Sequence, residues 1–274
     1  MIKNYILLVT GLFKLCLLYI LRISSLLPIN IRYCIIDKIS LVVFHICRKK
    51  RDAVARNLEL ILEKKSEIND VRMVFLEYGR YWAEFFDIKR FWADTKRIID
   101  NPEFPPKDNN FLGLTFHLGN FEVFGPALFP FIGGNFSVIA ERLRPDFLSN
   151  FFKKYRLRHH ITTILHDDKR EILNALNQER ALGVVCDRVV GGRGVEVRLF
   201  GKKVRLPLNI VSLAIQKKKP IVVSYCVKEE NALKMYYQKL PTDLKYDEAI
   251  DQIVILLEDA IRKYPFQWHV LSSF

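Results

Sequence analysis

The chain begins with two long apolar stretches. From Tyr5 to Leu21 every residue is apolar or small except Thr10 and Lys14, and a second apolar stretch runs from Asn30 to Cys47. At 100° per residue, Lys3, Thr10 and Lys14 fall on one side of a helix, and leucines and isoleucines cover the rest. We therefore predict two N-terminal helices, the first of which carries a narrow polar stripe.

The pattern changes twice after these helices. Residues 50–98 repeat apolar side chains at helical spacing, and an aromatic-rich helix is expected from about Val71 to Phe86. The segment Asn101–Asn110, rich in proline and asparagine, is the clearest break in the chain. Beyond it, short apolar runs alternate with helical patterns, which is typical of an α/β sheet covered on both faces.

The predicted fold is therefore α/β, with a mixed, mostly parallel central sheet flanked by helices. Residues 1–48 are expected to form membrane-associating helices, and residues 49–274 the α/β domain. The expected strands are Phe111–Phe116, Phe136–Ala140, Ile161–Leu165, Leu182–Cys186, Val195–Phe200, Ile221–Val227 and Met235–Leu240. The expected helices in this part are Phe121–Phe129, Pro145–Tyr155, Lys169–Asn177, Pro207–Gln216 and Asp247–Lys263.

The charge favours an anionic partner. Lys and Arg number 43 against 30 Asp and Glu, which leaves a net charge of +13. An anionic membrane, an acidic carrier protein or an acidic substrate fits this balance. Nucleic acid fits poorly, because the sequence has no helix-turn-helix pattern, zinc finger or ribonucleoprotein motif. The scattered cysteines contain no C-x-x-C pair and predict neither a disulfide framework nor a zinc site.

The first apolar stretch is interpreted as a membrane element. A transmembrane helix needs about 20 apolar residues, and a lysine near its centre costs about 3 kcal/mol. The helix should therefore lie deep in the membrane interface with Lys14 reaching the polar surface, or form a short span. Two alternatives stay open: a cleaved signal peptide, although no small-x-small cleavage site follows, and a helix buried in a soluble core. The cluster Arg48–Arg51 suits an anionic cytoplasmic leaflet or, equally, a solvated helix start.

One histidine stands where α/β folds place their chemistry. His117 and Glu122 have a His-x4-Glu spacing, but His166 and Glu171 repeat that spacing in a charged segment that we interpret as a solvated helix start, so spacing alone carries little weight. His117 instead follows an apolar strand directly, at the carboxyl end where open α/β sheets hold their sites. Glu122 would accept a bond from one ring nitrogen and leave the other to take a proton from an alcohol. A structural histidine that caps the strand is the alternative.

Blocks of sequence around this histidine resemble a known family. Phe116-His-Leu-Gly-Asn-Phe-Glu122 resembles the H-x4-D/E block of the bacterial lipid A biosynthesis acyltransferases, within the wider lysophospholipid and glycerolipid acyltransferase group. Three further blocks agree in order, and the resemblance covers roughly residues 50–274. They are Ala140-Glu-Arg-Leu-Arg-Pro145, then Val185-Cys-Asp-Arg188 with Gly192-Arg-Gly-Val-Glu-Val-Arg-Leu-Phe-Gly201, and Pro265-Phe-Gln-Trp268.

The resemblance implies a glycerolipid acyltransferase-like fold and an acyl transfer reaction. His117 would be the general base that deprotonates an acceptor hydroxyl, and Glu122 would orient it. The acyl group would pass directly from acyl carrier protein or a coenzyme A thioester, so neither an acyl-enzyme nor a metal or cofactor is implied. The arginine block places Arg142, and with less support Arg144, near the reacting carbonyl or an acceptor phosphate.

The later block adds further candidates and some departures. Asp187, Arg188 and Arg193 are candidate substrate-binding residues, with a structural ion pair beside a glycine turn as the equal alternative. Phe121 stands where relatives commonly carry tryptophan. The C-terminus lacks the basic continuation that is usual in the family, which puts any acceptor contact by such a tail in doubt.

The acceptor is expected to be a membrane glycolipid, either a lipid A precursor or a phosphatidylinositol mannoside, at the cytoplasmic face of the inner membrane. Several basic groups could line the site mouth for an acidic carrier or lipid phosphates, or be ordinary solvated faces. These groups are Lys153, Lys154, Arg156, Arg158, Lys202, Lys203, Arg205 and Lys217 to Lys219.

Two functions of other classes compete with acyl transfer. A thioesterase or lipid hydrolase would use water as the acceptor, but the sequence has no G-x-S-x-G nucleophile elbow. A non-catalytic membrane-binding protein would use His117 only as a strand cap.

Overall fold

The computed structural model describes residues 2–87, 110–123, 125–126, 136–178, 180–188, 194–230 and 232–273. Arg193 and most of the predicted break at Asn101–Asn110 lie outside the described residues. Within the described ranges the fold is α/β, with a mostly parallel sheet flanked by helices, as the sequence predicts.

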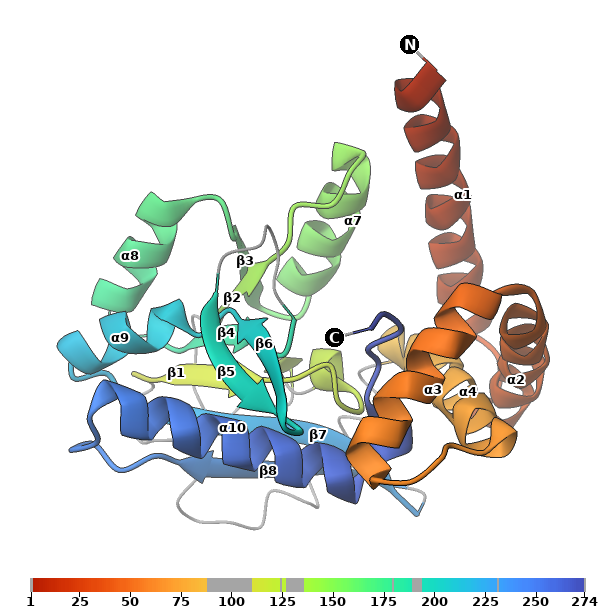
Figure 1. The fold of residues 1–274 in the computed structure, drawn as a ribbon. Helices are drawn as coiled ribbons and strands as arrows, with labels where there is room; N and C mark the ends of the chain where they lie inside the picture. The colour runs from red at the N-terminus through yellow and green to blue at the C-terminus, as the bar shows by residue number, and fades with distance from the viewer. Residues whose placement is uncertain are drawn as a thin grey trace.

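The N-terminal part is helical (Figure 1). Its elements are α1 (Ile2–Ser24), α2 (Ile29–Ile46), α3 (Arg48–Leu62) and α4 (Ile68–Phe85). Helices α2 and α4 approach closely because Gly79 has no side chain: a Cβ there would lie 2.0 Å from Ser40 Oγ. Phe44, Val54 and Phe75 form a small core that joins α2, α3 and α4.

The central sheet has the strand order β3-β2-β4-β1-β7-β8, and among its described strands only the β7–β8 pair is antiparallel. Its strands are β1 (Leu112–Thr115), β2 (Phe136–Ala140), β3 (Ile161–Leu165), β4 (Leu182–Val185), β7 (Ile221–Glu229) and β8 (Ala232–Lys239). The helices around it are α7 (Asp146–Leu157), α8 (Lys169–Asn177), α9 (Asn209–Gln216) and α10 (Tyr246–Lys263), followed by the 3-10 turn η1 (Pro265–Gln267).

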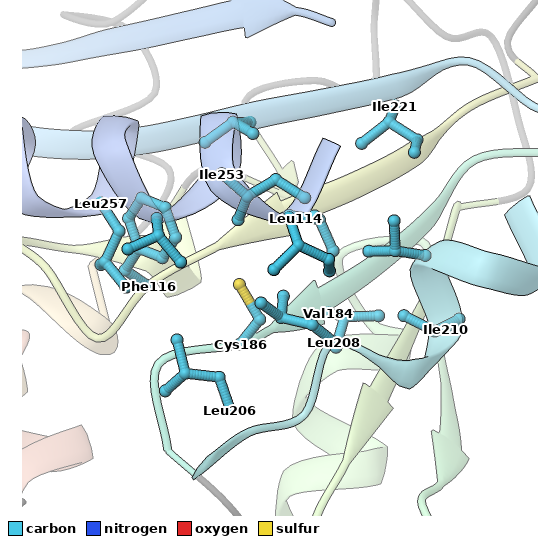
Figure 2. Packing of buried hydrophobic residues seen from close by; sticks show 14 of the residues in the cluster. Leu114, Phe116, Val184, Cys186, Leu206, Leu208, Ile210, Ile221, Ile253 and Leu257 are labelled. Carbon is cyan, nitrogen blue, oxygen red and sulfur yellow. The ribbon is translucent and has the colours of Figure 1, made fainter. Parts of the chain in front are cut away.

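Both faces of the sheet are covered, so its strands are apolar on both sides. On one face Leu114 and Val184 pack with Ile253 and Leu257 of α10 and with Ile210 of α9 (Figure 2). The opposite face packs against α4 and α7 through a second cluster that contains Phe136, Val222, Phe85 and Tyr155. Each fully buried large apolar side chain contributes about 1.5–3 kcal/mol to folding, so the two cores fix the sheet between its helix layers.

A two-stranded hairpin, β5 (Val195–Leu199) and β6 (Lys202–Leu206), lies beside α10. Its first strand was predicted and its second was not. The β6 sequence Lys202-Lys-Val-Arg-Leu206 alternates weakly and is largely exposed, so it lacks the apolar signal of a core strand. Phe200 and Gly201 turn the chain with positive φ angles of 49° and 73°.

Helix α1 rises beside α7 (Figure 1), where Gly11 lies against Pro145 and Tyr19 contacts Phe151. It is long and apolar enough to span a membrane, over Leu7–Ser24 with mean hydropathy 1.9, and only 11% of that window is buried. A helix of a soluble core would be mostly buried, so that alternative does not fit. The exposed apolar side chains of α1 and α2 form what we call the apolar helix surface: Leu8, Leu12, Phe13, Ile20, Ile23, Ile31, Ile35, Ile39, Val42 and Ile46.

Candidate functional site

The carboxyl ends of the parallel strands bring the predicted site residues to one edge of the sheet. His117 follows β1, Asp187 and Arg188 follow β4, Arg142 follows β2, and Asp167 follows β3. Because these strands are neighbours in the order β3-β2-β4-β1, residues distant in sequence meet there. The expectation that His117 lies at a strand end is confirmed.

His117 pairs with Asp187. Strands β1 and β4 are parallel, and their register places Thr115 opposite Val185. Two positions further along each chain, His117 and Asp187 therefore lie opposite each other as well. His117 Nδ1 lies 2.7 Å from Asp187 Oδ1, and the His117 backbone N–H donates to Asp187 Oδ2 at 3.0 Å. The aspartate side chain is fully buried, whereas a quarter of the histidine side chain, 25%, is exposed.

Asp187 is held as a charged acceptor. The Trp268 indole Nε1–H donates to Asp187 Oδ2 at 2.7 Å, so both carboxylate oxygens are engaged. Burial by itself would raise the pKa of Asp187, but the charge of His117 and the hydrogen bonds from His117 and Trp268 outweigh it, and the pKa lies below its usual value. The carboxylate therefore stays ionised and fixes the imidazole tautomer with the proton on Nδ1.

Glu122 contacts a different residue from the one expected. Its carboxylate forms an ion pair with Arg156 of α7, with Arg156 Nε donating to Glu122 Oε2 at 3.1 Å and Arg156 Nη2 donating to Oε1. Both side chains are largely buried, with 10% and 16% exposed. The expected hydrogen bond between Glu122 and the His117 ring is thus wrong for this structure, because the β1–β4 register gives Nδ1 to Asp187 and the helix beginning at Phe121 turns Glu122 towards α7.

The turn between His117 and Glu122 is pressed against β7. Gly119 has a φ of +59°, and a Cβ there would lie 2.0 Å from the Cys226 carbonyl oxygen. The Asn120 N–H donates to that same carbonyl at 2.7 Å. Only glycine allows this close approach, so Gly119 is required to bring the turn onto the sheet.

The C-terminal segment clamps the other side of the turn. The Gly119 N–H donates to the Gln267 carbonyl at 2.8 Å, and the His269 N–H donates to the His117 carbonyl at 2.7 Å. Between them Trp268 reaches Asp187. The Pro-Phe-Gln-Trp268 block was recognised in the sequence without a role for its residues. A buried tryptophan needs a hydrogen-bond acceptor for its indole N–H. This requirement was the feature of the sequence that could have indicated a role for Trp268.

Aromatic rings lie around His117. Phe121 lies edge-on to the His117 ring with centroids 5.1 Å apart, and Tyr81 stacks on Phe121 at 5.4 Å. His269 lies 5.3 Å from Tyr81, and burial, followed by the charge of His117, lowers the pKa of His269 to about 3. His269 is therefore neutral at physiological pH and adds no positive charge beside His117.

The arginine block lies at the same sheet edge but binds carboxylates. Arg142 donates from Nε and Nη2 to Asp167 at 2.6 and 3.0 Å. Arg144 donates to Asp146 Oδ1 at 2.7 Å, and 60% of each of those two side chains is exposed. Neither arginine contacts His117 in the described structure.

The candidates of the Asp-Arg block separate. Asp187 joins His117, whereas Arg188 points to another neighbour and donates from Nη2 to Glu141 Oε2 at 2.9 Å. Half of the Arg188 side chain is exposed. Arg193 lies outside the described residues, so its predicted substrate contact stays a prediction.

Two of the basic residues expected at the site mouth are not surface charges. Arg156 is paired with Glu122, as described above. Lys219 is 4% exposed and donates to the Gln178 carbonyl at 3.0 Å and to Asn110 Oδ1. Neither residue is available to an acidic carrier protein.

The arrangement supplies a base for proton transfer. Asp187 occupies Nδ1 of His117, which leaves Nε2 to accept a proton from a hydroxyl group or a water molecule at the sheet edge. The partner carboxylate stabilises the imidazolium that forms.

Known proteins similar to this chain are acyltransferases. The family model described as bacterial lipid A biosynthesis acyltransferase matches residues 3–273. The chain is 27% identical to a phosphatidylinositol mannoside acyltransferase of Mycolicibacterium smegmatis over 240 residues, which are 81% of this chain and 78% of that protein. It is 26% identical to a phosphatidylinositol mannoside acyltransferase of Mycobacterium tuberculosis over 214 residues, which are 71% of this chain and 66% of that protein.

Proposed function

The chain belongs to the bacterial lipid A biosynthesis acyltransferase family and is an acyltransferase, and we propose that it moves a fatty acyl chain from a carrier thioester to a hydroxyl group of a membrane glycolipid. The observation that carries this proposal is the His117–Asp187 pair, with the second ring nitrogen of His117 left for the acceptor. Such a pair is what proton removal from an alcohol requires.

The proposed reaction has one base and no acyl-enzyme. His117 Nε2 takes the proton of the acceptor hydroxyl while that oxygen attacks the thioester carbonyl carbon. The tetrahedral intermediate collapses, the carbon–sulfur bond breaks, and the leaving thiolate takes the proton from the imidazolium. Asp187 orients the ring and stabilises its charged form through the 2.7 Å contact. Glu122 acts on the site only through Arg156, by fixing the helix that follows the turn.

Arg142 and Arg188 are the proposed groups for substrate anions. Each lies at the carboxyl edge of the sheet in an exposed ion pair, with Asp167 and Glu141 respectively. Exposed ion pairs contribute only about 0–1 kcal/mol, so a phosphate or a developing oxyanion can replace the carboxylate at little cost. Arg144 is a weaker candidate because its exposed partner, Asp146, lies two residues away on the same segment.

The donor is proposed to be acyl carrier protein or coenzyme A, both of which are anionic and suit the net charge of +13. For the acceptor, the names of the relatives favour a phosphate-bearing mannoside lipid over a lipid A precursor. In either case a hydroxyl group of the acceptor lipid is the group that His117 would deprotonate.

The protein is proposed to work at the cytoplasmic face of the inner membrane. The apolar helix surface of α1 and α2 supports this location because so much exposed apolar area is unfavourable in water. The cluster Arg48–Arg51 begins α3 directly after it, where anionic headgroups would meet these charges at roughly 1 kcal/mol each.

A labelled acyl donor tests the reaction. Membranes are incubated with labelled acyl carrier protein and the wild-type chain, His117→Ala or the control His45→Ala, which removes an exposed histidine of α2. We expect label in a glycolipid with the wild type and the control, and none with His117→Ala. Wild-type-like transfer by His117→Ala would refute the assignment.

Hydrolysis is the second candidate function, because the same pair can deprotonate water. The experiment above distinguishes it: release of labelled free fatty acid with no label in lipid would favour a thioesterase, and so would independence of the rate from added membranes.

A further inference from the structure

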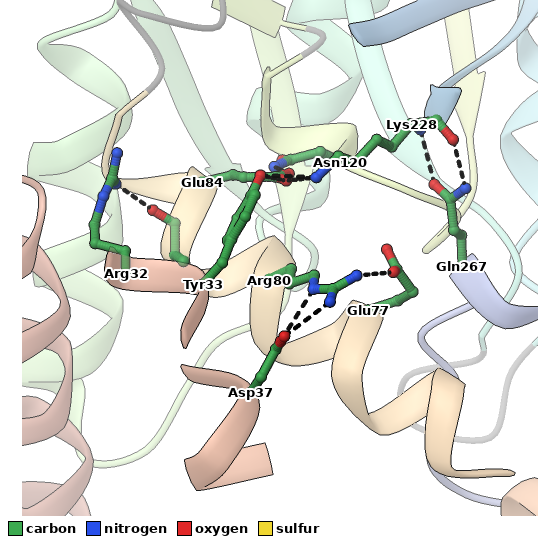
Figure 3. A network of polar contacts seen from close by, with 10 residues as sticks. Arg32, Tyr33, Asp37, Glu77, Arg80, Glu84, Asn120, Lys228 and Gln267 are labelled. Carbon is green, nitrogen blue, oxygen red and sulfur yellow. Dashed lines mark hydrogen bonds and ion pairs between the residues drawn. The ribbon is translucent and has the colours of Figure 1, made fainter. Parts of the chain in front are cut away.

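A buried carboxylate links the N-terminal helices to the catalytic turn. Glu84, at the end of α4, is 3% exposed. Its Oε2 accepts a hydrogen bond from Asn120 Nδ2 at 2.9 Å, and its Oε1 accepts one from the Tyr33 hydroxyl at 2.6 Å (Figure 3). Lys228 Nζ, from β7, lies 3.5 Å from Oε1. One carboxylate thus joins α2, α4, the sheet and the turn.

Asn120 depends on this carboxylate. It lies within the His117–Glu122 turn, is 1% exposed, and accepts the Val123 N–H at 3.1 Å through its carbonyl as the following helix begins. Its side-chain Oδ1 is buried without a hydrogen-bond partner among the described residues. The hydrogen bond from Nδ2 to Glu84 therefore sets the orientation of the Asn120 side chain among the described residues.

Tyr33 fixes Glu84 from α2. Lys228 Nζ donates to the Tyr33 hydroxyl at 2.9 Å and lies 4.2 Å from the centre of the ring. Burial and then the charge of Glu84 raise the pKa of Tyr33, so the hydroxyl stays a donor to the carboxylate. The charge of Glu84 is satisfied by three groups that belong to three different elements.

We propose that Tyr33, Glu84 and Asn120 form a positioning relay that holds the turn carrying His117, so that α2 is part of the active unit as well as of the apolar helix surface. The inference rests on the proposed function and adds to it. Buried, charge-assisted hydrogen bonds are strong and directional, and a shift of about 1 Å in a catalytic group can reduce turnover by about 100-fold.

The first test exchanges the two groups of the relay. Asn120→Asp places two carboxylates against each other, and we expect kcat to fall by about 100-fold with KM changed less than about threefold. The double variant Asn120→Asp with Glu84→Gln restores a carboxylate–amide pair and should recover most of the lost kcat. Wild-type kcat in Asn120→Asp, or no recovery in the double variant while it is folded, would overturn the relay.

The matched control lies in the same helix pair. Arg80 of α4 donates to both oxygens of Asp37 of α2 at 3.0 and 2.8 Å, and this pair has no contact with the turn. Tyr33→Phe removes one hydroxyl from the relay. Asp37→Asn keeps every hydrogen bond of the relay and weakens the ion pair of Arg80, whose guanidinium lies 5.7 Å from the centre of the Tyr33 ring. We expect kcat to fall in Tyr33→Phe alone. An equal fall in both variants would assign the effect to helix packing and overturn the proposal.

Hydrogen exchange measures the relay without the reaction. Amides of residues 117–123 should exchange faster in Tyr33→Phe than in the wild type, and at the wild-type rate in Asp37→Asn. Unchanged exchange in Tyr33→Phe would overturn the relay. Lack of acyl transfer by the wild type would instead refute the proposed function and leave the exchange result to decide the structural link.

Discussion

Replacing Asp187 by asparagine should disable His117 while the fold is kept. The carboxylate accepts from the His117 ring at 2.7 Å, from the His117 backbone at 3.0 Å and from Trp268 at 2.7 Å. An asparagine has one acceptor oxygen, so its NH2 group must face one of these donors or force the imidazole proton onto Nε2, where His117 can no longer accept a proton. The wrong tautomer costs about 10⁴ in kcat in a serine protease triad, and we expect a loss of about 10²–10⁴, or about 3–5 kcal/mol.

The comparison variant is Glu122→Gln. It removes the charge opposite Arg156 but changes no described contact of the His117 ring. We therefore expect kcat per folded molecule to fall about tenfold or less. The loss of the charged partner of Arg156 should lower the free energy of unfolding by about 1–3 kcal/mol. The assay is kcat for transfer from a labelled acyl donor, with thermal melting of each variant. An equal loss of kcat in the two variants would refute the view that Asp187, and not Glu122, orients the base.

The effect of Asp187→Asn on stability should depend on pH. The pKa of Asp187 lies below its ordinary value of 3.8 in the folded chain, so the ionised carboxylate stabilises the fold above about pH 4 and loses this contribution as the pH falls through the lowered pKa. The free energy of unfolding in urea should therefore differ between wild type and Asp187→Asn at pH 7 and converge at low pH. A constant difference down to pH 2 would contradict the linkage.

Three further perturbations follow from contacts around the site. Trp268→Phe removes one hydrogen bond to Asp187 and should lower stability by about 1.5–3 kcal/mol in denaturant melts and kcat by about tenfold; an unchanged melt would show that the indole bond contributes nothing. Arg156→Ala leaves the largely buried Glu122 unpaired and should cost about 3–5 kcal/mol of stability, an expectation that a wild-type midpoint would contradict. Deletion of residues 1–24 should move the protein from the membrane to the soluble fraction on centrifugation, and an unchanged partition would count against α1 as the membrane element.

The apolar pattern was enough to predict most elements of the fold. The runs Phe136–Ala140 and Ile161–Leu165 form strands with the predicted bounds, because both belong to a sheet buried on both faces. The hairpin strand Lys202–Leu206 was missed because its charged residues face solvent. Pairing with Val195–Leu199 gives it its structure, and such a contact leaves no apolar periodicity in the strand itself.

The position of the candidate site was predictable, but its pairing was not. His117 could be placed at a strand end because the apolar run before it is contiguous. Its partner comes from a register between strands about 70 residues apart, as the separation of His117 and Asp187 shows, and single-sequence spacing does not contain that register. Local spacing favoured Glu122, a residue that the following helix turns towards Arg156.

Chemical rescue tests the role of His117 most directly. Purified wild-type chain and His117→Ala are supplied with labelled acyl donor and acceptor glycolipid in vesicles, with and without added imidazole. The account predicts transfer by the wild type, none by His117→Ala, and partial return of transfer to His117→Ala as imidazole fills the vacated space and accepts the hydroxyl proton. Transfer by His117→Ala at the wild-type rate without imidazole would contradict it.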